Sequence, residues 1–304
     1  SRGLGDVYKR QGQTHTIRDG ATHATIGGGF FHDAFTAYST VSGGRENCAG
    51  GDFNTNAPLI GGENATVGGG RRNIAFAESS TIAGGRLGRV DGVNGTIAGG
   101  SSNRVFDDSG AIGGGTNNEA GSDDGVPSSA IGATVAGGQS NIARESGSTV
   151  SGGLLNIASG YTSTVSGGNV NIASGDFGAI GGGFVNHASG NGATVSGGNI
   201  NTASGEYSTV GGGQYNIAAA RFATIAGGGP TDDVVASITN NRVYDDYGSI
   251  GGGGGNRVGT DNAFTNDAVF STVSGGSGNS ASGSYAAIGG GLTNIASNAV
   301  CTVS

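Results

Sequence analysis

The chain has 304 residues, of which 68 are glycine, three are proline and none is tryptophan or methionine, and its formal net charge is −8. Glycine at this frequency without a Gly-X-Y triplet excludes collagen, and the regular recurrence of Val and Ile argues against disorder. The acidic balance argues against nucleic acid as a partner, and no stretch approaches the roughly 20 apolar residues of a membrane helix. We therefore expect neither nucleic-acid binding nor membrane insertion, and a periodic fold.

The N-terminal segment 1–19 does not follow the pattern of the rest of the chain. Residues 3–11 match nothing that comes later and hold the only lysine, Lys9, so we interpret part of this segment as translated adapter or read-through sequence. The chain starts without Met and stops inside a repeat, which we interpret as a fragment. We expect residues 20–304 to form one repeat domain.

From residue 20 onward an apolar anchor recurs, and twelve of the sixteen intervals between anchors are fifteen residues long. The seventeen anchors are Ile26, Val41, Val67, Ile82, Ile97, Ile112, Val135, Val150, Val165, Ile180, Val195, Val210, Ile225, Ile250, Val273, Ile288 and Val303. In the clearest stretch, an asparagine follows the anchor by six residues and an alanine follows it by eight, as Asn156 and Ala158 follow Val150.

Each repeat divides into two half-repeats, such as 148–152 and 156–160, in which the recurrent residues alternate with a period of two. This alternation predicts two short strands in each repeat, and the glycines between them suit tight corners. Stacked coils would pair as parallel strands about 4.8 Å apart. The expected fold is all-β, a parallel β-solenoid (β-roll) with 15-residue coils.

The near-invariant side of each coil is expected to face inward, so that Val or Ile packs against Ala in a thin roll. The recurrent Asn is then either an internal ladder from coil to coil or a turn residue that tolerates left-handed backbone. By the same alternation Cys48 takes an outward position and Cys301 an inward one.

A second apolar set alternates with the interior residues and should face outward. It consists of Leu155, Ile157, Val170, Ile172, Val185, Ile200, Tyr215 and Ile217. A continuous exposed apolar stripe marks an interface, so we expect the chain to associate with itself, most simply as a homotrimer. The alternative is that inside and outside are inverted and these residues form the core.

Four longer intervals place insertions near 50–60, 119–130, 229–240 and 259–270, and loops on repeat scaffolds frequently lie on the binding face. The segment 103–108 recurs as 241–246, which indicates duplication of a block of coils. The aspartate pairs in these two segments could bind a cation or carry acid/base chemistry, or they could simply solvate a corner.

Segments 171–175 (Asn-Ile-Ala-Ser-Gly) and 163–168 (Ser-Thr-Val-Ser-Gly-Gly) resemble the YadA-like, haemagglutinin-type head repeats of trimeric autotransporter adhesins. The resemblance covers roughly residues 24–304, although that family commonly uses coils of fourteen residues. It implies a trimer of left-handed β-rolls that is extracellular, on a bacterial cell surface. The expected function is therefore a structural and adhesive rod that binds a surface, matrix, glycan or other cell.

Ice binding and enzyme activity are the other functions to compare with adhesion. An outward threonine row, Thr149, Thr164, Thr194, Thr209 and Thr224, and a resemblance of the half-repeats to grass ice-binding rolls suggest ice binding as the alternative. The chain lacks nucleophile motifs, phosphate loops and spaced metal ligands. We therefore predict no enzyme activity, and no catalytic, cofactor-binding or metal-binding residue.

Overall fold

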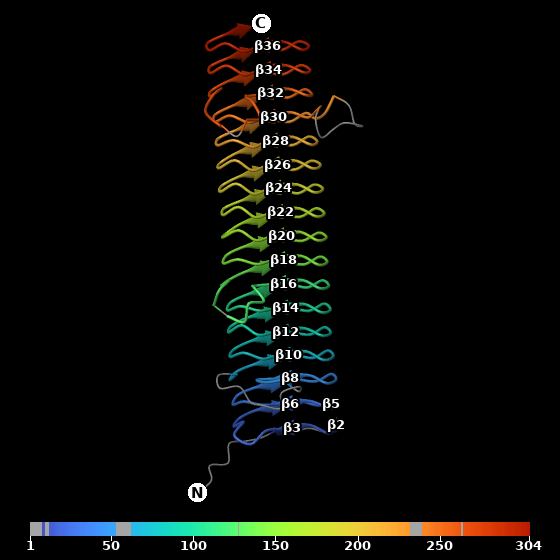
Figure 1. Cartoon of the computed structure of the whole chain (residues 1–304). Coiled ribbons are helices and arrows are strands. Elements are labelled where there is room, and N and C mark those ends of the chain that lie inside the picture. The colour runs from blue at the N-terminus through green and yellow to red at the C-terminus, as the bar shows by residue number, and fades with distance from the viewer. Residues whose placement is uncertain (1–7, 10–11, 53–61, 127, 232–238, 263) are drawn as a thin grey trace. The chain divides into compact units, whose positions relative to one another are not determined.

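The computed structural model describes residues 8–9, 12–52, 62–126, 128–231, 239–262 and 264–304. It confirms an all-β parallel β-solenoid of about 18 turns with coils of about 15 residues. The chain divides into two compact units, residues 1–155 and 156–304. Within each unit, the strands of successive coils lie above one another (Figure 1).

Each coil contributes one strand to an anchor sheet, which carries the Val and Ile anchors. In unit 1 the anchor sheet contains β1 (Tyr8–Lys9), β4 (Thr25–Ile26), β7 (Thr40–Val41), β9 (Thr66–Val67), β11 (Thr81–Ile82), β13 (Thr96–Ile97), β15 (Ala111–Ile112), β17 (Thr134–Val135) and β19 (Thr149–Val150). In unit 2 it contains β21 (Thr164–Val165), β23 (Ala179–Ile180), β25 (Thr194–Val195), β27 (Thr209–Val210), β29 (Thr224–Ile225), β31 (Ser249–Ile250), β33 (Thr272–Val273), β35 (Ala287–Ile288) and β37 (Thr302–Val303).

A second strand of each coil belongs to an alanine sheet, named for its usual inward residue. In unit 1 this sheet contains β3 (Thr16–Ile17), β6 (Asp33–Ala34), β8 (Cys48–Ala49), β10 (Ile74–Ala75), β12 (Arg89–Val90), β14 (Arg104–Val105), β16 (Glu119–Ala120) and β18 (Ile142–Ala143). In unit 2 it contains β20 (Ile157–Ala158), β22 (Ile172–Ala173), β24 (His187–Ala188), β26 (Thr202–Ala203), β28 (Ile217–Ala218), β30 (Arg242–Val243), β32 (Arg257–Val258), β34 (Ser280–Ala281) and β36 (Ile295–Ala296).

Four residues after the anchor, a single residue bridges in parallel to its equivalents in neighbouring coils, and we call this row the corner column. In unit 1 it consists of Phe30, Arg45, Arg71, Arg86, Ser101, Thr116, Gln139 and Leu154. In unit 2 it includes Asn169, Phe184, Asn199, Gln214, Gly229, Gly254, Ser277 and Leu292. In the coil at the start of unit 1 this corner is a strand pair, β2 (Gly12–Gln13) with β5 (Gly29–Phe30).

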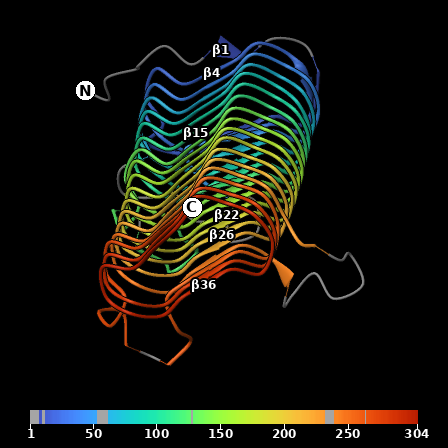
Figure 2. The same cartoon turned by 90° about the horizontal axis from the view of Figure 1, so that it is seen from above.

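Within each unit, strand pairing keeps the described coils in the same register across the insertions. Ile74 of β10 pairs with Cys48 of β8, for example, although 53–61 lie outside the described residues. Figure 2 shows the insertions of unit 2 leaving the coils at different corners. A further coil, formed by β1, β2 and β3, precedes the first anchor and lies within the segment that the sequence pattern left outside the repeat.

The interior is lined as the alternation predicts. Val150 and Ala158 are completely buried, whereas Leu155 is 47% exposed. The inverted arrangement, with the Leu and Ile rows as core, is therefore wrong. A different expectation fails at Cys48, which takes the outward position of β8 but is fully buried, because the chain returns over it and the carbonyl of Gly51 accepts a hydrogen bond from its Sγ at 2.9 Å.

The recurrent asparagines form the internal ladder. Asn171 is fully buried, and its Nδ2 donates to the carbonyls of Gly167 and Gly183, both at 3.0 Å, and to Oδ1 of Asn156 at 3.2 Å. Its own Oδ1 accepts the backbone N–H of Asn186 at 2.9 Å. Each amide thus satisfies backbone groups in its own coil and in the next coil, and it also bonds to the side-chain amide of the preceding coil.

This ladder also explains why the corner beside it is glycine. Gly168 has a φ of 89°, and a Cβ there would collide with the carbonyl oxygen of Gly183 in the next coil. In the first coils of unit 1 the ladder position holds His15 and His32, whose rings stack with centroids 5.1 Å apart. The same column therefore accepts another planar side chain that can hydrogen-bond in both directions.

Candidate interaction surfaces

The predicted apolar residues lie on the outer surface. Leu155 is exposed at the end of unit 1, and the other seven are half-buried in unit 2. We call these seven the apolar stripe, which contains Ile157, Val170, Ile172, Val185, Ile200, Tyr215 and Ile217. The stripe combines two positions, one at a corner five residues after the anchor and one on the alanine sheet, seven residues after it.

The corner members of the stripe have a strained backbone. Val170, Val185 and Ile200 have φ values of 57°, 53° and 55°. The left-handed conformation costs an L-residue about 1–2 kcal/mol and is a genuine outlier for a β-branched side chain, whereas Gly or Asn adopts it readily. Apolar side chains at these outward corners therefore oppose the local backbone preference.

The stripe does not extend over the whole of unit 2. Beyond Ile217 the alanine sheet presents Arg242 and Arg257 at the same outward position. In unit 1 the equivalent positions border a groove of about 620 Å³ lined by Thr14, Thr16, Phe31, Asp33, Glu46, Arg72, Ile74 and Leu87. The same place on the coil is therefore largely polar in unit 1 and largely apolar in the first coils of unit 2.

The predicted threonine row lies on the outward face of the anchor sheet. In unit 2, Thr194, Thr209 and Thr224 pair in register, and Ala179 separates them from Thr164. Unit 1 holds a longer run of outward threonines. Its consecutive coils present Thr25, Thr40, Thr66, Thr81 and Thr96. Thr149 is the one threonine of unit 1 that was predicted, and it is not part of this run.

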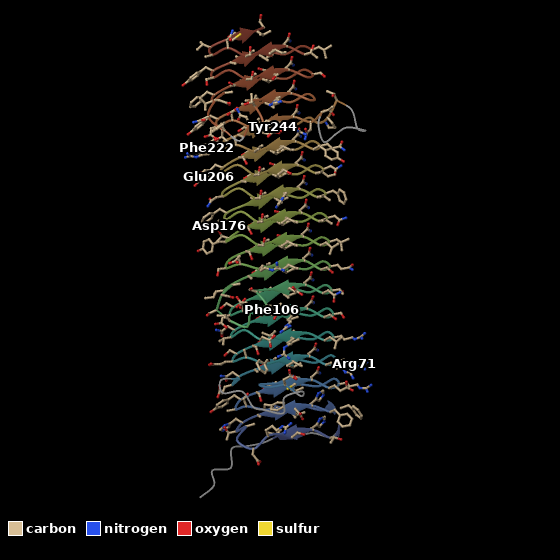
Figure 3. The ribbon with its side chains drawn as sticks, in the orientation of Figure 1. Arg71, Phe106, Asp176, Glu206, Phe222 and Tyr244 are labelled. Carbon is tan, nitrogen blue, oxygen red and sulfur yellow. The ribbon has the colours of Figure 1, made fainter. Side chains whose placement is uncertain are left out.

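An aromatic ladder in unit 2 was not predicted. It consists of Tyr207, Phe222, Tyr247, Phe270 and Tyr285, each three residues before an anchor, and successive rings stack with centroids 4.6–5.4 Å apart and interplanar angles of 12–17°. Their spacing repeats that of the anchors and was the signal that could have revealed them. The inner rings are covered on both faces, so the ladder presents ring edges at the margin where Figure 3 labels Phe222. Each pair stabilises the coil stack by about 0.5–1.5 kcal/mol.

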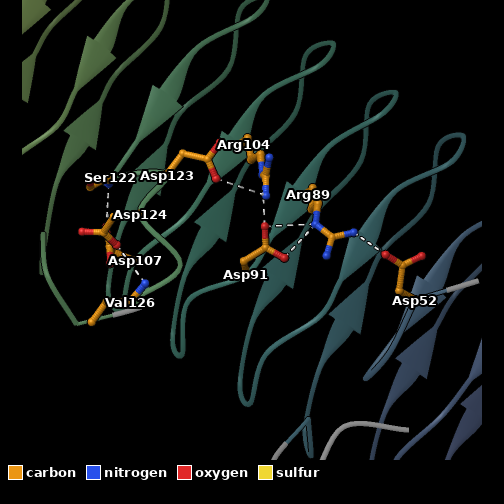
Figure 4. A network of polar contacts seen from close by, with 9 residues as sticks. All are labelled: Asp52, Arg89, Asp91, Arg104, Asp107, Ser122, Asp123, Asp124 and Val126. Carbon is orange, nitrogen blue, oxygen red and sulfur yellow. Dashed lines mark hydrogen bonds and ion pairs between the residues drawn. The ribbon is translucent and has the colours of Figure 1, made fainter. Parts of the chain in front are cut away.

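The duplicated aspartates hold the insertions in place. Asp107 is fully buried and accepts the Ser122 N–H at 2.6 Å, and Asp245 accepts the Thr260 N–H at 3.2 Å in the same way. Figure 4 shows the first of these sites in unit 1. In each pair the second aspartate accepts a backbone N–H from the preceding coil, as Asp108 does from Val93 at 2.8 Å. These contacts give the pairs a structural role at the corners.

The two anchoring sites differ in the residue that forms the further hydrogen bond to the first aspartate. In unit 1, Ser129 donates its Oγ–H to Asp107 at 3.3 Å, whereas in unit 2 the equivalent residue, Asp267, donates its backbone N–H to Asp245 at 3.3 Å. Burial, aided by the Asp267 carboxylate, raises the pKa of Asp245 to about 6. Hydrogen bonds, led by that from Asn262, lower the pKa of Asp267.

Groups with possible catalytic chemistry are sparse in the described part of the chain. Ser174 Oγ lies 3.1 Å from His187 Nε2, and burial lowers the pKa of this histidine. Among the described residues, no carboxylate is hydrogen-bonded to that ring to complete a triad, and no three His, Cys, Asp or Glu side chains gather as a metal site. The described segments also include no helix that could span a membrane. No protein-family profile and no curated protein matches the chain.

Proposed function

We propose that this chain is a non-catalytic structural and adhesive solenoid, displayed outside the cell, which associates with copies of itself and binds a surface, matrix, glycan or other cell. The observation that carries the proposal is the apolar stripe. The resemblance to YadA-like heads supports a homotrimer as the assembled form.

The energetics of the stripe favour self-association. More than half of each side chain is already covered by its own coil, so only the remaining apolar surface is available to a partner at about 25 cal/mol per Å². The corner residues Val170, Val185 and Ile200 are also strained where Asn or Gly would not be. Contact with a second copy would supply a stabilisation that the isolated coil does not provide.

Sedimentation velocity of the whole chain tests this proposal. We expect a single species with a multiple of the 29.2 kDa chain mass, persisting at low micromolar concentration. A species that remains monomeric up to 100-fold higher concentration would contradict self-association. The variant Val170→Asn/Val185→Asn/Ile200→Asn and its control Leu87→Asn distinguish the stripe from other surfaces.

Ice binding is the second candidate, favoured by the in-register threonines of the anchor sheet. Successive threonines lie about 4.8 Å apart along a flat strand face. The residues two positions further on are small, for example Ser42, Gly68 and Ala83, so the threonine side chains stand clear of bulky neighbours. A flat, regular array of hydroxyl and methyl groups is the type of surface that can order water.

Thermal hysteresis measurements distinguish this candidate. If the threonine face binds ice, the chain depresses the freezing point below the melting point, and Thr209→Lys reduces the effect because a long charged side chain interrupts the row. Thr202→Lys is the matched control, since Thr202 faces outward from the alanine sheet of the same unit. The absence of hysteresis in the wild-type chain would eliminate ice binding.

A further inference from the structure

Unit 1 carries a file of arginines on its corner column. Arg45, Arg71 and Arg86 form consecutive parallel bridges, and Arg72 adjoins Arg71 in the sequence. All four are exposed, and Arg71 projects away from the strands in Figure 3. Successive corner residues lie about 4.8 Å apart, the spacing of paired strands. The corner column thus presents one guanidinium per coil over three coils, and Arg72 adds a fourth in the middle coil.

This arrangement has an excess of positive charge that the chain does not neutralise. Glu46 forms ion pairs with Arg45, at 2.9 Å, and with Arg72. Among the ion pairs of the described residues, neither Arg71 nor Arg86 takes part. Among the described residues, one carboxylate therefore pairs with two of the four guanidinium groups, in a protein whose net charge is −8.

The coil itself does not require arginine at this position. The column continues in unit 1 with Ser101, Thr116 and Gln139, which form the same bridges. Like charges in register repel one another by about 1 kcal/mol per pair in water at such a distance. Two other arginines of unit 1, Arg89 and Arg104, are by contrast neutralised by Asp91 (Figure 4). The unneutralised file is therefore a specific feature of three coils.

Aromatic side chains lie at one end of the file. Phe30 precedes Arg45 in the column, and the Arg45 guanidinium lies over its ring, 5.4 Å from the centroid. Phe31 packs edge-on against Phe30 and is 44% exposed. Exposed ring surface beside cationic groups suits a ligand that has both apolar C–H faces and anionic substituents, as an acidic sugar does.

We propose that Arg45, Arg71, Arg72 and Arg86 bind an extended anionic polysaccharide through its sulfate or carboxylate groups. Guanidinium groups bind such oxyanions with two parallel hydrogen bonds. A file one residue wide fits a single linear chain lying along the coils, whereas a flat lipid surface or a double helix presents its charges over a broader area. This proposal names a ligand class for the adhesive function proposed above and rests on it.

Fluorescence anisotropy with a labelled, sulfated hexasaccharide tests the proposal on the whole chain. We expect saturable binding that weakens with salt, because each ion pair formed releases counterions. The double variant Arg71→Gln/Arg86→Gln should raise Kd about tenfold, and Arg144→Gln, which removes an exposed arginine outside the file, should leave Kd within twofold. Ser101→Arg lengthens the file and should lower Kd several-fold.

Three results would overturn the proposal: an unchanged Kd in the double variant, an equal loss in Arg144→Gln, or tighter binding of a single-stranded oligonucleotide or of phosphatidylserine vesicles than of the hexasaccharide. Sedimentation of the same variants keeps the two proposals apart. A monomeric chain with arginine-dependent glycan binding contradicts self-association alone. A self-associating chain that binds the glycan no better than the double variant contradicts the glycan site alone.

Discussion

Replacing the three strained corner residues of the apolar stripe with asparagine should leave folding stability nearly unchanged while it weakens self-association. In Val170→Asn/Val185→Asn/Ile200→Asn, each site loses a left-handed strain of about 1–2 kcal/mol. Each also loses the apolar burial of the covered part of its side chain, about 1–2 kcal/mol. The two contributions nearly cancel, so we expect unit 2 of the monomer to keep its stability to within about 2 kcal/mol.

Association should weaken sharply in the same variant. The solvent-exposed parts of the three apolar side chains contribute about 1 kcal/mol each when a contact buries them. Their loss from each chain corresponds to roughly a 100-fold increase in the dissociation constant. Urea unfolding followed by circular dichroism, at concentrations where the chain is monomeric, measures the stability, and sedimentation velocity measures the association.

Leu87→Asn is the matched control, because Leu87 has the same left-handed φ of 57° and is 39% exposed, but lies in unit 1 outside the stripe. It should relieve a similar strain and leave the sedimenting mass unchanged. A triple variant that is destabilised by several kcal/mol while keeping its mass would refute the reasoning, since the corner side chains would then serve only their own coil.

Three further predictions concern single sites. Asn171→Ala should destabilise unit 2 by about 3 kcal/mol, because the buried Asn186 N–H loses its acceptor and the hydrogen bonds to Gly167 and Gly183 are lost as well; urea unfolding against the wild type measures this, and a change below 1 kcal/mol would contradict it. As the pH rises from 4 to 7, Asp245 loses its proton beside the Asp267 carboxylate. The free energy of opening of the 259–268 insertion, measured by hydrogen exchange, should therefore fall by at most about 3 kcal/mol. Asp267→Ser, which places the serine of the unit 1 site at this position, should abolish the trend. Burial raises the pKa of Cys48 well above its usual range, so a thiol reagent should modify Cys301 rapidly and Cys48 only after unfolding, and two fast thiols in the native chain would be inconsistent with the fold.

The sequence was sufficient to predict the coil because its interior is repetitive and nearly free of alternatives. A period of two within each half-repeat gives the direction of every side chain, and a period of fifteen gives the register. For Asn171 and its equivalents the sequence left a ladder and a turn residue as alternatives, and the hydrogen bonds to the neighbouring coils decide for the ladder. The same alternation places Leu155 outward and Val150 inward, as the structure has them.

The surfaces were less predictable because they depend on the insertions and on corner geometry. Cys48 has an outward position by alternation, and only the path of the chain after β8 buries it. Asp107 and Asp245 became structural anchors because the insertions fold back onto them. The stacking of Tyr207 on Phe222 brings together two side chains that leave the same left-handed corner in successive coils, a conformation that alternation does not reveal.

The internal ladder also explains how one backbone can carry such different surfaces. The coil register is fixed by inward residues such as Val150 and Asn171, so outward positions vary without disturbing the pairing. The outward corner after the anchor sheet is cationic at Arg71 and Arg72 in unit 1 and apolar at Val170 in unit 2, yet the strands there pair in the same register. Selection for binding can therefore act on one column of side chains at a time. On this argument the residues that determine the partner lie where the coil has no structural need for them, as the arginine file and the strained valines do.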